Sequence, residues 1–291
     1  MKIFKSLLIG CIAMLSLGTQ AATPVKIDLW PDGAPVENGF DPKKERIEDG
    51  YKLMDVAKAE LWIYPAKNPN GVCVMLTPGG GYQCLVIEKE GTMFADWLSA
   101  QGFTCAVLKY RMPNGHKEIP LMDAERAMEI LRAKATEYHY NPNKIGVMGG
   151  SAGGHFAAML STLYSSPATR PDFQILLYPV IYMDVTNSLS HKNSAKRLLG
   201  PNPTEEDYKK YCLQNQVSPM TPPALIVLSC DDKVVDPLNS LEYVKALKKN
   251  NVPCTLHIYS EGGHGYGNLD TNPFKLEFQT ELLRFLNDQI K

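Results

Sequence analysis

Short apolar segments alternate with amphipathic segments from residue 59 to the end of the chain, and this alternation restricts the fold more than any other feature. The pattern predicts strands over 59–64, 71–76, 103–110, 145–148, 173–181, 224–229 and 255–259. It predicts helices over 92–100, 121–138, 152–164, 239–250 and 274–290. Strands and helices in this order form a mostly parallel central sheet with helices on both faces and right-handed crossovers. We therefore expect an α/β protein.

The charge balance limits the kinds of partner that the chain can bind. Thirty Lys and Arg residues face 31 Asp and Glu residues, so the formal net charge is −1. Proteins that bind a nucleic acid or an anionic lipid surface usually carry a clear excess of basic residues, and this sequence has no such excess. We expect no nucleic-acid partner and no membrane-spanning contact, and the oligomeric state stays open. No linker divides residues 22–291, so we expect one domain there.

The first 21 residues have the pattern of a signal peptide. Residues 1–5 carry two lysines, residues 6–18 are mostly apolar, and Thr19-Gln20-Ala21 offers a cleavage site after Ala21. The sequence thus predicts export to the periplasm or the medium. An uncleaved anchor is one alternative, and a lipoprotein box ending at Cys11 is another.

The remaining cysteines and the histidine spacing indicate no metal or cofactor. Cleavage after Ala21 would leave six cysteines, of which Cys73, Cys105 and Cys230 lie in or next to apolar strands, where cysteine is usually a small buried side chain. No CxxC, HExxH or EF-hand pattern occurs. We expect mostly free thiols, no cofactor and no metal.

Ser151 is the strongest candidate for a catalytic residue. The segment Gly149-Gly150-Ser151-Ala152-Gly153 fits G-x-S-x-G and stands between a predicted strand and a predicted helix. At such a turn, small neighbours let the strand and the helix pass closely, and the serine hydroxyl is exposed at the helix N-terminus. The alternative is a glycine-rich packing turn. We expect Ser151 to be a nucleophile.

A second glycine-rich turn follows the strand at 71–76. Gly79, Gly80 and Gly81 leave backbone N–H groups uncovered, and a nucleophilic serine needs such donors for an oxyanion. A phosphate cradle is the alternative, but the phosphate-binding glycine motifs are absent. The sequence predicts an oxyanion hole formed by the N–H groups of Gly80, Gly81 and Ala152, with Tyr82 as a possible substitute for one of them.

The last two strands are followed by an acidic loop and a histidine. His264 lies in the glycine-rich loop Gly262–Gly267, where it has no core to fill, so a general base is expected there. The loop after residues 224–229 contains Asp231, Asp232 and Asp236, any of which could orient this histidine. Asp184, after another strand, is a further candidate. A serine, an aspartate and a histidine in this chain order fit the triad order of α/β-hydrolases.

Five separated motifs in this order carry a resemblance. They are Pro78–Tyr82, Lys89–Gly91, Leu108–Arg111, Gly149–His155 and Gly263–Gly265. The chain from about residue 60 onward resembles the acetyl esterase and acetylxylan esterase branch of the α/β-hydrolases, which is common in polysaccharide-degrading bacteria. It departs from hormone-sensitive lipase relatives by having Pro78 where they carry histidine.

The resemblance implies a site and a reaction. In related hydrolases a valine follows the triad acid by three residues, and Asp232 has Val235 at that spacing, so the implied triad is Ser151, Asp232 and His264. The implied reaction is the hydrolysis of short acyl esters, such as the acetyl groups of xylan or other hemicellulose sugars.

The segment 184–223 interrupts the alternation between two core strands. Its prolines and polar residues predict a lid or binding insertion at the carboxyl ends of the strands, where ligand sites of α/β sheets lie. We expect it to overhang Ser151, with Leu198, Tyr208 and Tyr211 among the residues that would wall an acyl pocket. A surface loop without this role is the alternative.

Three other functions compete with ester hydrolysis. A serine peptidase of the prolyl oligopeptidase type shares the triad order, but residues 22–58 are too short for the large N-terminal domain of those enzymes. A glycoside hydrolase needs two carboxylates flanking the scissile bond, and the sequence singles out no such pair. A non-catalytic binding protein on this fold would normally have lost the serine or the histidine, and both are present.

Overall fold

A computed structural model describes residues 23–291 of the protein. The predicted signal peptide over residues 1–21 lies outside the described residues. Within them, no helix is both long enough and apolar enough to cross a membrane.

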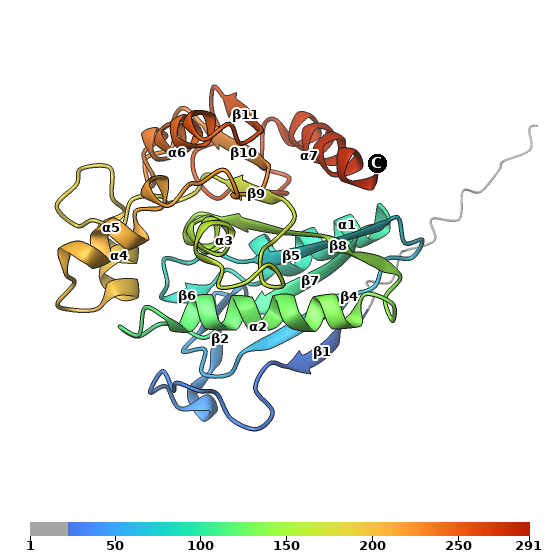
Figure 1. The fold of residues 1–291 in the computed structure, drawn as a ribbon, viewed down its shortest axis with the longest axis horizontal. Helices are drawn as coiled ribbons and strands as arrows, with labels where there is room; N and C mark the ends of the chain where they lie inside the picture. Colours follow the sequence, from blue (N-terminus) through green and yellow to red (C-terminus); the bar gives the residue numbers. More distant parts are fainter. Residues whose placement is uncertain (1–22) are drawn as a thin grey trace, which may run out of the picture.

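The centre of the molecule is an eight-stranded sheet whose middle and far edge are parallel (Figure 1). In spatial order the strands are β1 (Val25–Asp28), β4 (Glu60–Tyr64), β7 (Thr104–Lys109), β5 (Gly71–Thr77), β8 (Tyr140–Gly150), β9 (Gln174–Leu177), β10 (Ala224–Ser229) and β11 (Cys254–Tyr259). The pairs β1–β4 and β4–β7 are antiparallel, and all the pairs from β7 to β11 are parallel. The mostly parallel sheet predicted from the alternation is thereby confirmed.

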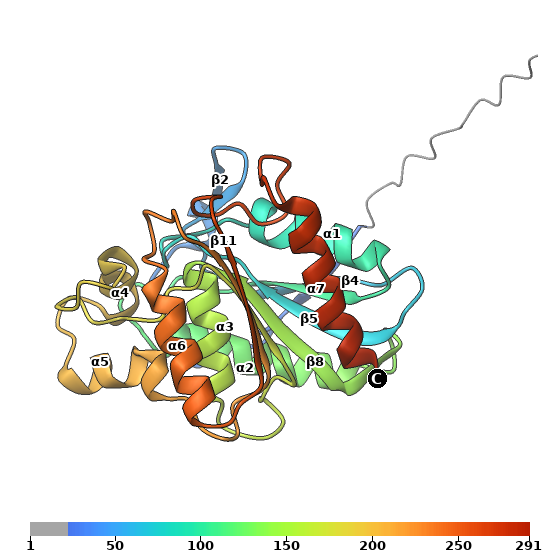
Figure 2. The ribbon, with the colours of Figure 1, turned by 90° about the horizontal axis from the view of Figure 1, so that it is seen from above.

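Helices cover both faces of this sheet (Figures 1 and 2). Helices α2 (Ile119–Lys134) and α3 (Ala152–Leu163) pack against each other on one face, and α1 (Met93–Ala100) and α7 (Lys275–Ile290) lie on the other. Helix α6 (Leu238–Lys249) packs beside β11. Strands such as β5 and β7 are buried almost throughout because both faces of the sheet are covered, which explains their continuous apolar sequences.

The segment before residue 59 contains strands that the sequence pattern did not reveal. Besides β1 and the 3-10 turn Pro42–Lys44, it forms β2 (Arg46–Glu48) and β3 (Lys52–Met54), and β3 pairs with β6 (Cys84–Leu85) in a small antiparallel sheet. These strands have three residues or fewer except β1, and β2 is exposed along its whole length. Alternation over so few residues gives no usable signal.

One predicted strand is shorter than its apolar run. The run at 173–181 suggested a strand through Ile181, but β9 ends at Leu177. Tyr178 has a positive φ of 36°, and Pro179 follows it, so the chain leaves the sheet there. The residues after the strand remain buried although they are not in the sheet, which is why the apolar run continues.

The insertion between β9 and β10 contains two short helices and a 3-10 turn. Helix α4 spans Lys192–Leu199, α5 spans Glu205–Tyr211 and η3 spans Leu213–Asn215. Thr204 begins α5 with a capping box, since its hydroxyl accepts from the Asp207 N–H and the Asp207 carboxylate accepts from the Thr204 N–H. Both views place α4 and α5 at the end of the molecule opposite the C-terminus (Figures 1 and 2).

Candidate active site

Ser151 occupies a sharp turn between the end of β8 and the start of α3. Its φ of 55° and ψ of −122° lie outside the regions that non-glycine residues usually adopt. The turn is held on both sides, because the Ser151 N–H donates to the Leu177 carbonyl at 2.9 Å and the Ser151 carbonyl accepts from the Val180 N–H at 3.0 Å. Strain of this kind persists only where the surroundings fix it, as two hydrogen bonds to the adjacent strand end do here.

The glycines around Ser151 are required by close backbone contact. A Cβ on Gly149 would lie 2.1 Å from the Gly153 carbonyl oxygen, and a Cβ on Gly153 would lie 2.0 Å from the Thr77 carbonyl oxygen. Neither neighbour is a flexible side chain, so each contact would force the backbone apart. The motif spacing therefore reflects the crossing of α3 over the ends of β5 and β8.

The three residues predicted as a triad meet at the carboxyl end of the sheet. His264 Nε2 lies 2.8 Å from Ser151 Oγ, and His264 Nδ1 lies 2.6 Å from Asp232 Oδ2. A carboxylate accepts hydrogen bonds only, so Nδ1 carries the imidazole proton and Nε2 is left as an acceptor for the serine hydroxyl. The side chain of Asp232 is almost fully buried, and that of His264 is mostly so.

The loop after β10 selects one aspartate among the candidates. Asp232 Oδ1 accepts from the N–H groups of Val234 and Val235 at 2.8 and 3.0 Å, which fixes its other oxygen on the histidine. Asp231 instead accepts from the Gly263 N–H, and Asp236 accepts from the N–H of the first residue of α6. The fourth candidate, Asp184, accepts from the N–H and hydroxyl of Thr186 in the insertion.

Among the described residues, the glycine turn after β5 leaves backbone N–H groups without an acceptor. Gly80, Gly81 and Tyr82 all have positive φ, of 127°, 64° and 57°. Within residues 23–291 their N–H groups donate to no other backbone or side-chain acceptor. Ala152 is the first residue of α3, so its N–H has no partner inside the helix. The predicted donors Gly80, Gly81 and Ala152 therefore retain free donor capacity beside Ser151.

A buried carboxylate that sequence reasoning left without a role lies beneath this turn. Glu90 Oε2 accepts from the Gly79 N–H at 2.7 Å, and Glu90 Oε1 accepts from the Tyr178 hydroxyl at 3.1 Å. Burial raises the pKa of Glu90, while the Gly79 N–H and the charge of His264 act in the opposite direction. The ring of Tyr178 in turn packs 4.8 Å from that of His264, so Glu90 holds elements on both sides of the serine.

The signal for Glu90 was present in the sequence but could not be interpreted there. It belongs to the Lys89–Gly91 motif of the resemblance, within a π-helical turn at Glu88–Thr92 that precedes α1. An isolated glutamate in a polar stretch is normally solvated. Its burial is visible only in the fold, where a Cβ on Gly150 would lie 2.9 Å from the Glu90 carboxyl carbon.

A second buried network connects the oxyanion turn, the serine helix and the insertion. The Tyr82 hydroxyl lies 2.8 Å from His155 Nδ1, and His155 Nε2 lies 2.9 Å from the Tyr211 carbonyl oxygen. A carbonyl only accepts, so Nε2 carries the proton and the tyrosine hydroxyl donates to Nδ1. Burial lowers the pKa of His155 to about 4, which keeps it neutral at neutral pH.

The insertion lies over the oxyanion turn, but through different residues from those expected. The ideal Cβ position on Gly81 is 3.2 Å from Arg197 Nη1 and 3.6 Å from Ser194 Oγ. His191, just before α4, is half-buried, and its Nδ1 lies 2.7 Å from Ser194 Oγ. Burial and the positive charge of His264 lower the pKa of His191.

The prediction that residues of the insertion wall an acyl pocket is corrected in part by the structure. Leu198 is packed into the core of the insertion, and Tyr211, which is almost fully buried, lines a cavity beside α2 that no member of the triad lines. Tyr208 is half-buried and does line a cavity next to the oxyanion turn. The apolar side chains of these helices pack the insertion against the rest of the protein. The sequence alone does not distinguish apolar residues with this packing role from apolar residues that line a site.

The described residues contain neither a metal-ligand cluster nor a paired cysteine. Over residues 23–291 no group of three or more His, Cys, Asp or Glu side chains could hold a metal ion. The six cysteines in the same range are free thiols. Cys73 and Cys105 are buried as expected, whereas Cys230 is exposed because it lies just past the end of β10.

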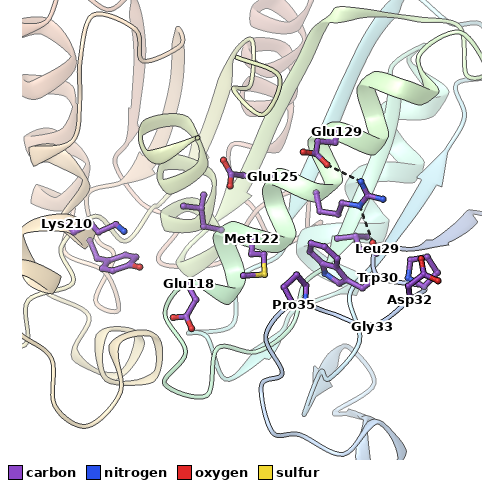
Figure 3. A pocket seen from close by; sticks show the side chains of 14 residues that line it. Leu29, Trp30, Asp32, Gly33, Pro35, Glu118, Met122, Glu125, Glu129 and Lys210 are labelled. Atoms are coloured by element: carbon purple, nitrogen blue, oxygen red, sulfur yellow. Dashed lines mark hydrogen bonds and ion pairs between the residues drawn. The ribbon is translucent and has the colours of Figure 1, made fainter. Parts of the chain in front are cut away.

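A separate cavity of about 670 Å³ lies between the segment after β1 and α2 (Figure 3). Trp30 and the carboxylates Glu118, Glu125 and Glu129 line it, but no member of the triad does. The Trp30 indole donates to Asp123, and two arginine guanidinium groups lie 5.9 Å from its ring centre. Because no member of the triad lines this cavity, it is not the place where Ser151 would meet an ester.

Comparison with known proteins agrees with this geometry. A model of the alpha/beta hydrolase fold family matches residues 74–268. The chain is 40% identical over 223 residues to an acetylxylan esterase of Xylanibacter ruminicola, covering 74% of this chain and 45% of that protein. It is 34% identical over 208 residues to endo-1,4-beta-xylanase B of Butyrivibrio fibrisolvens, covering 66% of this chain and 32% of that protein. The chain thus spans less than half the length of these curated relatives.

Among solved structures, the chain is similar to a protein of nearly the same length. The crystal structure of an acetyl ester-xyloside bifunctional hydrolase from Caldicellulosiruptor lactoaceticus superposes with a TM-score of 0.76 at 31% sequence identity. The match covers 91% of this chain and 96% of that one. The similarity therefore extends over nearly the whole of both chains.

Proposed function

Since the chain belongs to the α/β-hydrolase family, we propose that it is a serine esterase that removes short acyl groups, chiefly acetyl, from hemicellulose sugars such as those of xylan. The observation that carries the proposal is the hydrogen-bonded series from Ser151 Oγ through His264 to Asp232, at 2.8 and 2.6 Å. The similarity to an acetylxylan esterase and to an acetyl ester-xyloside bifunctional hydrolase supports an acetyl ester as the substrate.

The geometry supplies each step of acyl transfer. His264 Nε2 takes the proton of Ser151 Oγ as the oxygen attacks the ester carbonyl, and Asp232 stabilises the imidazolium that results. The N–H groups of Gly80, Gly81 and Ala152 would stabilise the oxyanion. The imidazolium then gives its proton to the leaving alcohol, which departs as the acyl-enzyme forms.

The second half of the reaction repeats these roles with water. His264 takes a proton from the water that attacks the acyl carbonyl, and returns it to Ser151 Oγ as the acid is released. The serine ends in its initial state, so an ester and water become an acid and an alcohol. Every proton moves through His264 Nε2, which is why the tautomer set by Asp232 matters.

Labelling the serine tests the proposal directly. A fluorophosphonate probe followed by peptide mapping should modify Ser151, and Ser151→Ala should lower kcat/KM for 4-nitrophenyl acetate by at least about 10³-fold. The matched control is Ser165→Ala, an exposed serine just past the end of α3, which should retain activity. Wild-type esterase activity in folded Ser151→Ala protein would overturn the assignment.

Substrate comparison separates esterase activity from the rival activities. The esterase proposal predicts decreasing kcat/KM from acetyl to butyryl to octanoyl 4-nitrophenyl esters, and acetate release from acetylated xylo-oligosaccharides. A peptidase would hydrolyse a peptide anilide with comparable efficiency, and a glycoside hydrolase would release reducing sugar from deacetylated xylan. Either activity at a similar rate in the same preparation would change the proposed reaction class.

We also propose that the protein is exported, on the basis of the sequence of residues 1–21. Expression of the full chain in a Gram-negative host should yield a periplasmic or secreted protein whose first residue is Ala22. Incorporation of labelled palmitate at Cys11 would instead favour a lipoprotein. An intact N-terminus in the cytoplasm would contradict export.

A further inference from the structure

A cavity of about 720 Å³ opens directly beyond the oxyanion turn. Tyr82 and Gln83 form its boundary with the site, and Lys196, Arg197 and Tyr208 of the insertion cover it. Its opposite wall comes from the N-terminal region, including Phe40 and Arg46. An acetyl group occupies far less space than this cavity offers, so the cavity suits the part of a substrate that lies beyond the ester bond.

Arg197 lies where this cavity meets the site and has no carboxylate partner. Its Nη1 is 3.5 Å from the Gly81 carbonyl oxygen, a long contact, and its side chain is half-buried. Within residues 23–291 no acidic side chain lies within ion-pair distance of it, whereas Arg111 pairs with Asp123 and Arg132 with Asp172. Partly burying a guanidinium without a partner costs free energy, so such a group is suited to receive an anion.

The charges around the cavity leave it positive. Lys196, on the same helix as Arg197, has no ion pair among the described residues either. The acidic residue that lines the cavity, Asp55, is already engaged by Arg46. Lys196 and Arg197 therefore line a cavity in which the charge of Asp55 is already balanced by Arg46. An anionic group that entered it would find charge complementarity and, at Arg197, bidentate donors.

The remaining lining resembles that of a carbohydrate site. Phe40, Tyr208 and Pro203 present apolar surface, which can pack against the C–H face of a sugar ring, and Gln83 is an exposed side-chain amide at the edge near the turn. A few polar groups set in apolar walls fix the orientation of a ligand.

We propose that this cavity binds a carboxylate carried by the ester substrate, with Arg197 as its recognition residue. The inference rests on the proposed esterase function and narrows its substrate class to acyl esters that bear an anionic group. The size of the cavity and its place beyond the oxyanion turn indicate a uronate sugar neighbouring the esterified sugar. A carboxylate at the far end of the acyl chain has the same chemistry, and the experiment separates the two sources.

The test compares acidic with neutral substrates in the intact protein. The first pair is an acetylated xylo-oligosaccharide with and without a uronic acid branch, and the second is the 4-nitrophenyl esters of succinic and butyric acid. We expect kcat/KM to be at least tenfold higher for the uronate member of the first pair. Preference in the second pair alone would place the carboxylate on the acyl side and would still support the cavity chemistry.

Variants on α4 then connect the preference to Arg197. Arg197→Gln should lower the ratio of acidic to neutral kcat/KM at least tenfold, and Arg197→Lys should retain part of it because the charge remains without the bidentate geometry. The matched control is Lys192→Gln, which removes a charge from an exposed position of the same helix outside the cavity, and it should leave the ratio unchanged. A ratio equally reduced by the control would assign the effect to general charge.

A measurement on the wild-type protein keeps the proposal testable if Arg197→Gln does not fold. D-Glucuronate should inhibit hydrolysis of 4-nitrophenyl acetate more strongly than D-glucose, and salt should weaken that difference. Equal inhibition by the two sugars together with no preference in either substrate pair would overturn the inference while ester hydrolysis stands. Absence of hydrolysis of every ester would instead remove the proposed function and the inference with it.

Discussion

Replacing Asp232 with asparagine tests whether the loop after β10 sets the tautomer of His264. The two backbone N–H groups of Val234 and Val235 both point at Oδ1 of Asp232. An asparagine has one acceptor oxygen, which those two donors should claim, so its NH₂ group would face His264 Nδ1. The imidazole proton would then move to Nε2, which could no longer accept the proton of Ser151.

The size of the effect follows from these contacts. Turning the amide over to restore the active tautomer would leave the N–H groups of Val234 and Val235 facing an NH₂ group. That costs about 2 kcal/mol, which lowers kcat/KM by a factor of about 30. Losing the carboxylate charge next to the imidazolium costs a further ~2–3 kcal/mol, which lowers kcat/KM by a factor of about 30 to 150. Together these predict a loss of about 10³ to 10⁴ in kcat/KM for Asp232→Asn.

The assay is steady-state hydrolysis of 4-nitrophenyl acetate, with the thermal unfolding midpoint measured in parallel. Asp236→Asn is the matched control, because asparagine also caps a helix well and Asp236 caps α6 without touching His264. The unfolding midpoint of Asp232→Asn should change little, because its backbone contacts are kept. Activity within tenfold of wild type in a folded Asp232→Asn sample would refute the tautomer argument.

Three further predictions concern the supports of the site. Gly153→Ala should lower the free energy of unfolding by about 3 kcal/mol and abolish activity, since its Cβ would lie 2.0 Å from the Thr77 carbonyl oxygen, and an unchanged unfolding midpoint would contradict this. Glu90→Gln should lower kcat/KM about tenfold and should move the acid limb of its pH profile to lower pH, because the negative charge of Glu90 stabilises protonated His264 and the substitution removes that charge. An acid limb that stays in place would show that Glu90 has a purely structural role. Burial lowers the pKa of His155 from 6.5 to about 4, so the unfolded chain binds a proton at a higher pH than the folded one, and the free energy of unfolding declines by up to about 3 kcal/mol as pH falls across that window. His155→Gln should make the decline of the thermal unfolding midpoint with falling pH less steep, and an equally steep decline would exclude His155 as its cause.

The sequence predicted the parts of the site that need a particular backbone. Gly149 and Gly153 stand out because a Cβ at either would strike another backbone segment, and Gly80 and Gly81 because both have positive φ. These requirements are local to a turn, so they leave a pattern of residue types at fixed spacing. The strand and helix alternation was readable for a similar reason, since burial on both faces demands continuous apolar runs.

The sequence could not predict which side chains would act through distant partners. Glu90 and Tyr178 are 88 positions apart, and Arg197 is 116 positions from Gly81. His191 gave no sign that it would be half-buried beside the triad. None of these residues has an unusual local pattern, because each one's role depends on a neighbour that only the folded sheet and the insertion bring near.

The sequence by itself determined the class of fold, the position of the serine turn, the glycine turn beside it and the histidine loop, because each is encoded in consecutive residues whose backbone geometry admits few alternatives. The spacing of Asp232 and Val235 already favoured one aspartate through the family resemblance. The tertiary structure alone decided that a carboxylate lies beneath the oxyanion turn, and that the insertion places at the mouth of a cavity an arginine with no ion-pair partner among the described residues. These depend on contacts between segments separated by tens of residues. A contact of that kind is fixed by the packing of the sheet and leaves no periodic trace in the chain.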